Sequence, residues 1–303
     1  MNMLACPNLL DLDSLQARFN QEIEALLPRE EDVQFFEEHG WYVSPQVIPE
    51  ELLDLALIGC DRFYRGERDG DLPHMDRFAN WQPQDGNVLR NNEFVARQIK
   101  EFQALTYSPI VAGTAARLSR SKAMRLLEEQ IIYKPGPVTD WTGTVGWHTD
   151  LAYCSYCTSD KILTAWIPLV DCDETMGAVT YFDGSHQWEE FRDLKQFQQT
   201  DLDSLETRLS EAGRPIHKVT MNLKRGQMSF HHGWTIHGSS PNRSDRPRIV
   251  MAIHFQPDGN AFQPVPNPKG GLFHHYLDPF CRKLPNGYPD YQDSSVYPLL
   301  WSE

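Results

Sequence analysis

The sequence lacks long hydrophobic runs and is short of basic residues. No stretch of its 303 residues approaches the roughly 18 to 20 apolar residues of a membrane-spanning helix, and its first residues lack the basic and apolar regions of a signal peptide. Its 42 acidic residues outnumber 28 basic residues, which gives a net charge of −14. A field of this sign disfavours binding to nucleic acid or to an anionic membrane. We therefore expect a cytoplasmic protein with neither partner.

Cysteines are also few. The chain has six of them, which does not suggest a disulfide scaffold in a protein of this length. Cys154 and Cys157 form a lone CxxC motif, whereas a zinc ribbon needs a second pair. A thioredoxin-like motif would need a helix N-terminus, and these two residues lie in an aromatic, strand-like run. We expect both cysteines to be structural.

The patterns that are present predict helices followed by strands. Asp13 or Ser14 can cap a helix that continues through Leu26, Gly40 can end a second helix, and Pro49 can open a third. Short β-rich segments follow, separated by turn residues, at 124–135, 161–171, 177–185, 217–224, 226–233 and 248–257. This order predicts a mainly β protein with a helical N-terminal part. Its core would be a double-stranded β-helix, a jelly roll of the cupin-like type, with supporting helices.

We expect a single domain over residues 1–303, because no segment separates two halves. Residues 1–120 would give mostly helical support, residues 121–256 the jelly-roll core, and residues 257–303 an irregular wrap whose aromatic residues favour burial. The polar insert between 186 and 216 is typical of a surface excursion. A lid over a functional site is the alternative.

Two residues in GWHTDLAYC are candidate metal ligands. Neighbours i and i+2 on a strand point to the same side, so His148 and Asp150 can reach one metal. Two histidines and one carboxylate on one face of the metal suit Fe(II) and leave positions open for a co-substrate and oxygen. A second His-x-Asp motif, His74 to Asp76, lies in the helical third without strands around it, and we expect no metal there.

The third ligand must come from a distant strand, and the candidates are His231, His232, His237 and His254. His237 is favoured because Gly238 and Ser239 follow it and Arg248 begins the next strand. Arginine suits bidentate recognition of a carboxylate. The pattern therefore predicts a metal ligand and a carboxylate-binding arginine on neighbouring strands. Alternating apolar residues after Arg248 predict that this strand is half-buried.

Together these segments resemble the phytanoyl-CoA dioxygenase family of Fe(II)- and 2-oxoglutarate-dependent oxygenases. The resemblance covers most of the chain and rests on four stretches: FFEEHGWYVSPQVIPEELLDLA, YKPG, ILTAWIPLVDCDETMGAVTYFDGSH and HGSSPNRSDRPR. One departure is Asp183, where the family usually has proline before Gly-Ser-His, and we expect it to alter only a turn. Halogenating relatives replace the metal-binding carboxylate with a small residue. Because Asp150 is present, halogenation is disfavoured.

The resemblance implies iron held by His148, Asp150 and His237, and these would be the catalytic residues. It implies 2-oxoglutarate held by Arg248. Further contacts to this co-substrate are implied for Ser239, Trp166 and Gln130.

The implied activity is that of a 2-oxoglutarate-dependent non-haem iron dioxygenase, a hydroxylase that uses O2 and releases succinate and CO2. We expect it to oxidise an unactivated C–H bond of a small molecule, an amino acid or a secondary-metabolite intermediate. An acyl-CoA is less favoured because no basic cluster suits its phosphates. Trp141, Trp147 and Tyr153 flank the iron motif and are candidate substrate contacts, with ordinary packing as the alternative. An anionic substrate would be favoured if any of three arginines faced the iron: Arg68, Arg77 or Arg90.

Several alternatives stay open at this point. The protein could be a cupin-like metal-binding or ligand-sensing protein without oxygenase turnover. The presence of Arg248 argues against this alternative, because such a protein would not need it. A zinc hydrolase can also use two histidines and an aspartate. The sequence does not separate hydroxylation from desaturation or ring formation, or a monomer from a homodimer.

Overall fold

The computed structural model describes residues 23–72, 81 and 85–303. The expected start of the first helix at Asp13 or Ser14, the motif from His74 to Asp76, and Arg77 lie outside these residues.

The N-terminal third is mainly helical, as predicted. Gly40 ends a helix in the left-handed conformation, and its N–H donates to the carbonyl of Phe36. Pro49 precedes a long helix, and Pro109 occupies the first turn of another. The elements are η1 (Ile23–Leu26), α2 (Glu30–His39), α3 (Glu50–Tyr64), α4 (Val95–Gln98), η3 (Lys100–Phe102), α5 (Gln103–Thr106) and α6 (Pro109–Leu118). Two strands lie among them: β1 (Trp41–Val43) and β2 (Arg90–Glu93).

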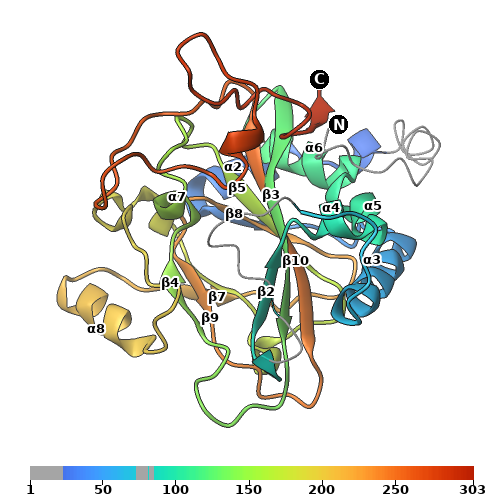
Figure 1. Cartoon of the computed structure of the whole chain (residues 1–303). Helices are drawn as coiled ribbons and strands as arrows, with labels where there is room; N and C mark the ends of the chain where they lie inside the picture. Colours follow the sequence, from blue (N-terminus) through green and yellow to red (C-terminus); the bar gives the residue numbers. More distant parts are fainter. Residues whose placement is uncertain (1–22, 73–80, 82–84) are drawn as a thin grey trace.

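Two antiparallel sheets form the core (Figure 1). The remaining strands are β3 (Ala123–Lys134), β4 (Val145–His148), β5 (Leu163–Pro168), β6 (Thr180–Phe182), β7 (Lys218–Thr220), β8 (Ser229–His232), β9 (His237–Ser239), β10 (Arg248–Pro257) and β11 (Leu299–Ser302). The larger sheet has the order β1-β8-β5-β10-β3-β11, with β2 also pairing with β3, and the smaller sheet has the order β4-β9-β6-β7. The prediction of a mainly β jelly-roll core with helical support is confirmed.

Strand β10 is buried on both faces, so the prediction of a half-buried strand was wrong. Met251 and Ile253 pack into a core that includes residues of α3, α5 and α6. Ala252 and His254 face the opposite way and line a cavity between the sheets. The helices therefore cover one face of the larger sheet, while its other face is available for a site.

Two segments outside the sheets complete the molecule. The polar insert carries η5 (Ser185–Gln187), η6 (Glu189–Phe191) and α8 (Asp203–Glu211), which extends at the lower left of Figure 1. The chain after β10 is largely irregular, contains η7 (Asp278–Phe280), and packs buried aromatic residues such as Tyr291 and Tyr297 before β11 joins β3. Two short helices follow strands of the core: α7 (Asp150–Tyr153) and η4 (Glu174–Met176).

Within the described residues, no helix is long and apolar enough to cross a membrane. Cys154 and Cys157 are free thiols.

Candidate active site

The structure brings His148, Asp150 and His237 together. Strands β4 and β9 pair with His148 opposite His237, and Asp150 opens α7 two residues after β4 ends. One ligand atom from each of the three buried side chains lies within 4.8 Å of the others. We had expected Asp150 to lie on a strand, but it lies at the start of a helix. Thr149 is nevertheless extended, with φ −121° and ψ 139°, so the two side chains still point to the same side.

Backbone carbonyls orient the two imidazoles. His148 Nδ1 donates to the carbonyl of Gly146 at 2.8 Å, and His237 Nδ1 donates to the carbonyl of Thr235 at 3.0 Å. A carbonyl can only accept, so each Nδ1 carries the proton and each Nε2 presents its lone pair. Burial, followed by the charge of His237, lowers the pKa of His148 to about 3. Burial and then His231 lower the pKa of His237 to about 4. Both rings are thus neutral at physiological pH, the form that binds metal.

The two oxygens of Asp150 have different partners. Oδ1 lies 3.4 Å from His237 Nε2 and 3.8 Å from His148 Nε2. Oδ2 accepts a hydrogen bond from Thr164 Oγ1 at 2.7 Å and lies 3.0 Å from His231 Nε2. These contacts leave Oδ1 facing the two imidazoles, so Oδ1 is the oxygen that would bind a metal.

The sheet register explains this arrangement. Thr164 of β5 lies opposite His231 of β8 on one side and opposite His254 of β10 on the other. His254 Nδ1 lies 2.9 Å from Thr164 Oγ1, and Gln130 Nε2 lies 3.0 Å from His254 Nε2. Sequence reasoning considered His231 and His254 only as alternative metal ligands and missed Thr164. Gln130, an expected co-substrate contact, supports this network as well as lining the cavity.

A small cavity of about 60 Å³ joins the triad to the expected co-substrate residues. It is lined by His148, Asp150 and His237 and also by Gln130, Trp166, Ser239 and Arg248. Strand β9 belongs to the smaller sheet and β10 to the larger sheet. The prediction that His237 and Arg248 lie on neighbouring strands was therefore wrong. The two side chains reach one cavity from different sheets.

Arg248 is a buried cation with an unused donor. The side chain is only 2% exposed, and its Nη1 donates to the carbonyl of Gly177. Its Nε has no hydrogen-bond partner among the described residues, and the guanidinium lies 5.6 Å from the centre of a Trp166 ring. Burial lowers the pKa of Arg248 to about 10, so the group stays charged at neutral pH. A buried donor of this kind suits an anionic ligand.

Lys134 was missed by sequence reasoning, although it lies in the YKPG stretch. It is 1% exposed, and its Nζ donates to Ser239 Oγ at 2.6 Å and to the carbonyl of Ser240 at 2.7 Å. Burial and then the charge of Arg248 push the pKa of Lys134 well below its usual value. The hydroxyl of Ser239 is therefore held by Lys134, and two basic groups gather at this end of the cavity.

The three expected substrate contacts have different positions. The structure does not bring Trp147 to the cavity, because adjacent residues on a strand face opposite sides. Its ring packs 4.5 Å from Phe182, and its Nε1 donates to the carbonyl of Leu202. Tyr153 is 44% exposed, with its ring 6.1 Å from that of His148. Trp141 is 55% exposed and lines an outer cavity.

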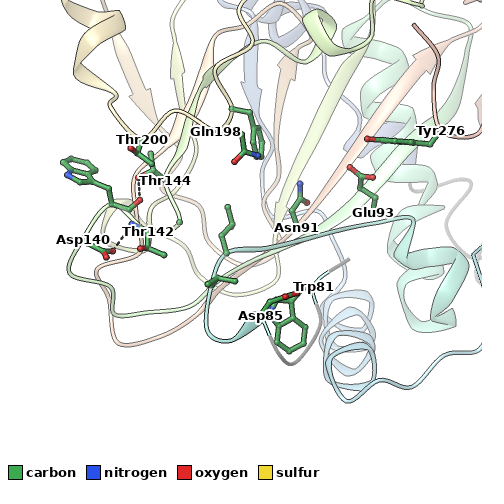
Figure 2. A pocket seen from close by; sticks show the side chains of 15 residues that line it. Trp81, Asp85, Asn91, Glu93, Asp140, Thr142, Thr144, Gln198, Thr200 and Tyr276 are labelled. Carbon is green, nitrogen blue, oxygen red and sulfur yellow. Dashed lines mark hydrogen bonds between the residues drawn. The ribbon is translucent and has the colours of Figure 1, made fainter. Parts of the chain in front are cut away.

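Figure 2 shows this outer cavity. It has a volume of about 900 Å³ and shares Leu89, Asn91 and Phe197 with the inner one. Phe197 belongs to the polar insert, and its ring lies 5.0 Å from that of His148. The insert is therefore more than a surface excursion, because it forms a wall beside His148 of the triad. Sequence reasoning missed Asn91 and Glu93, which lie on the short polar strand β2 without an apolar pattern.

Comparisons with known proteins agree with this geometry. The family model described as "Phytanoyl-CoA dioxygenase (PhyH)" matches residues 12–250. "Phytanoyl-CoA dioxygenase, peroxisomal" from Mus musculus is 22% identical over 262 residues, covering 83% of this chain and 74% of the mouse protein.

Solved structures share the fold. SnoK, a non-heme alpha ketoglutarate dependent carbocyclase from nogalamycin biosynthesis, gives a TM-score of 0.65 at 20% identity, over 90% of this chain and 96% of SnoK. The epimerase SnoN in complex with Fe3+, alpha ketoglutarate and nogalamycin RO gives 0.60 at 20% identity, over 92% and 99% of the two chains. EctD from S. alaskensis with 2-oxoglutarate and 5-hydroxyectoine gives 0.60 at 16% identity, over 78% and 79%. The chain belongs to the phytanoyl-CoA dioxygenase family of 2-oxoglutarate-dependent non-haem iron oxygenases, which confirms the resemblance inferred from its motifs.

Proposed function

We propose that the protein hydroxylates, or otherwise oxidises, an unactivated C–H bond of a small molecule and releases succinate and CO2. The observation that carries this proposal is Arg248, a buried charged group whose Nε lacks a partner among the described residues, in the same cavity as the triad. A metal held only for structure or sensing needs no such group, whereas a co-substrate with a distal carboxylate does.

The residues fit an iron site. His148, Asp150 and His237 would hold the ion with two neutral imidazoles and one carboxylate oxygen, which suits Fe(II). When bound, iron with 2-oxoglutarate supplies the chemistry that activates O2 and oxidises a C–H bond. Arg248 pairs with the distal carboxylate of 2-oxoglutarate. Lys134 holds the Ser239 hydroxyl at the same end of the cavity.

The surrounding side chains position the co-substrate and exclude water. Trp166 provides an apolar wall next to Arg248. Gln130 lines the cavity and is tied to His254. A dry, shaped cavity strengthens the charge pairing that holds 2-oxoglutarate.

The outer cavity is the substrate site in this proposal. Its volume of about 900 Å³ is sufficient for an amino acid or a secondary-metabolite intermediate, and threonine and amide side chains line it. SnoN was solved with nogalamycin RO and EctD with 5-hydroxyectoine, and both ligands are small molecules. SnoK is a carbocyclase, so ring formation stays an alternative outcome to hydroxylation.

The first experiment tests co-substrate binding. Adding Fe(II) and 2-oxoglutarate to the purified protein without oxygen should produce a weak metal-to-ligand charge-transfer band. In air, a metabolite screen that monitors succinate should yield a product heavier by one oxygen atom. Asp150→Ala should abolish substrate-coupled succinate formation, because the ion loses its only carboxylate ligand. A wild-type protein without the band would exclude this function, and full activity of the variant would remove Asp150 from the ligand set.

A further inference from the structure

Glu93 is an acidic side chain that points into the outer cavity from β2 (Figure 2). The pairing of β2 with β3 places it opposite Gln130, which lines the inner cavity. Among the described residues, no hydrogen bond or ion pair involves the Glu93 carboxylate. Burial, and then the charges of Glu128 and Glu129, raise its pKa to about 8. A largely buried carboxylate next to other carboxylates is costly unless a cation pairs with it.

A second acceptor points into the cavity from the same strand. Asn91 lies two residues before Glu93, so both side chains share one face of β2 (Figure 2). Asn91 Oδ1 is buried and has no hydrogen-bond partner among the described residues. Both groups accept hydrogen bonds, so a ligand that satisfies them must supply N–H or O–H donors.

Aromatic rings form much of the remaining wall. Trp81, Trp141, Phe197 and Tyr276 line the same cavity. The face of an aromatic ring attracts an organic cation, and a carboxylate combined with such rings is a common recognition site for one. Arg90 and Arg243 already lie over the rings of Trp81 and Trp141, so this aromatic wall accommodates cationic groups.

Arg68 and Arg90 were the described candidates for binding an anionic substrate. Arg68 donates to the carbonyl of Phe63 at 2.9 Å and lies over its ring. Arg90 lies over the rings of Tyr133 and of Trp81, a wall residue of the outer cavity, and its Nε has no partner among the described residues. Neither arginine lines the outer cavity, and no lysine, arginine or histidine does so in the described part of the chain. The condition that would have favoured an anionic substrate is therefore not met by Arg68 or Arg90.

We propose that the substrate carries a cationic nitrogen group, an amine, amidine or guanidine, which Glu93 and Asn91 bind in the outer cavity. This inference rests on the proposed function, because it takes the outer cavity as the substrate site. Glu93 releases its proton to solvent when the cation binds and then pairs with the positive charge, while Asn91 accepts an N–H hydrogen bond and the aromatic rings lie beside the cation. The substrate cation would then bind at Glu93, which lines the outer cavity and not the inner one that contains Arg248.

The test uses the complex of the protein with Fe(II) and 2-oxoglutarate, without oxygen. The probes are three matched pairs: arginine and citrulline, agmatine and N-carbamoylputrescine, and lysine and N6-acetyllysine. Binding is followed through the change that each probe causes in the charge-transfer band, and succinate is measured in air. We expect cationic members to bind at least about 10-fold more tightly than their neutral counterparts, as for a charge-assisted hydrogen bond.

Glu93→Gln keeps the shape of the side chain and removes its charge. It should weaken binding of the cationic probes by about 10- to 100-fold and leave the neutral probes unchanged. Glu211→Gln is the matched control, because it removes one acidic charge at an exposed position at the end of α8 and Glu211 lines neither cavity. Its effect should stay below about 3-fold, as is usual for an exposed charge.

The outcomes separate this inference from the proposed function. If the wild type gives no charge-transfer band, the proposed function fails. If the band forms but no cationic probe binds more tightly than its neutral counterpart, only the cationic substrate is overturned. The same holds if Glu93→Gln leaves cation binding unchanged. Should Glu93→Gln not fold, Asn91→Leu and the wild-type preference between matched probes still decide the question.

Discussion

The inner and outer parts of the cavity differ in charge. The inner part has Arg248, which is almost completely buried, at the end away from the Asp150 carboxylate, and Lys134 lies behind it on Ser239 without lining the cavity. The outer part has Glu93 at depth, with Asp85 and Asp140 also in its wall. A net charge of −14 hides this division, because it describes only the field of the whole molecule. Local groups in a low-dielectric cavity decide which ligand binds there.

Two buried polar atoms in the walls of the cavity have no partner among the described residues. Arg248 Nε, a donor, lies in the inner part, and Asn91 Oδ1, an acceptor, lies where the two parts meet, because Asn91 lines both. Such atoms cost free energy in the free protein and are satisfied by a ligand of the complementary kind. The comparison therefore suggests two ligands of opposite charge, whose positions relative to the triad are set by different residues.

The largest expected effect comes from removing the inner cation. Arg248→Leu should raise the KM for 2-oxoglutarate by about 100-fold or more, because a buried charge-assisted pair is lost. The charge-transfer band should disappear at submillimolar 2-oxoglutarate, while binding of Fe(II) alone persists. Arg243→Leu is the control, because Arg243 is exposed and donates to the carbonyl of Val138 outside this cavity. An unchanged KM in Arg248→Leu would show that the inner part does not hold the co-substrate.

The elements that the sequence predicted well are those with a strong local signal. The segment 248–257 was predicted as a strand and forms β10 with the same bounds, because alternation and flanking turn residues define it. The meeting of His148, Asp150 and His237 was predictable because few patterns place two histidines and a carboxylate among strands. His148 and Asp150 still point to the same side although a short helix begins at Asp150, because Thr149 is extended.

The contacts that were missed depend on register and on the approach of the two sheets. Thr164, His231 and His254 meet because β8, β5 and β10 align them at one level, and one sequence contains no register signal. Lys134 meets Ser239 only because β3 and β9 belong to different sheets that come close. Trp147 could have been excluded, since alternation from His148 turns it away.

A smaller effect is expected on Fe(II) affinity when the support of Asp150 is removed and the groups that would bind the two ligands are left in place. Thr164→Val removes the hydroxyl that donates to Asp150 Oδ2 and keeps the shape of the side chain. Losing this support should weaken Fe(II) binding by about 10-fold, within the range for groups that orient metal ligands. Thr114→Val in α6 is the control, because it removes a buried hydroxyl that bonds only its own helix. Equal iron affinity in both variants would show that Thr164 does not position Asp150.

The smallest effect concerns stability and tests whether the ionised Glu93 carboxylate destabilises the fold when no cation is bound. Its pKa is raised from 4.5 to about 8 by burial, then by Glu128 and Glu129. Between these values the folded protein binds a proton that the unfolded chain has lost. The stabilisation is therefore complete below about pH 4.5 and is lost as the pH rises through 8. Glu93→Gln cannot titrate, so the Tm of the wild type relative to this variant should fall between pH 5 and pH 9. A fall of roughly 5 °C is expected for a chain of this size, measured by thermal unfolding without metal or ligand. Glu211→Gln, at an exposed position at the end of α8, controls for the loss of one acid. If the Tm curves of wild type and Glu93→Gln run parallel, the Glu93 carboxylate already has a stabilising partner in the free protein. The outer part of the cavity would then not need a cationic ligand, whereas the inner part would still need an anionic one.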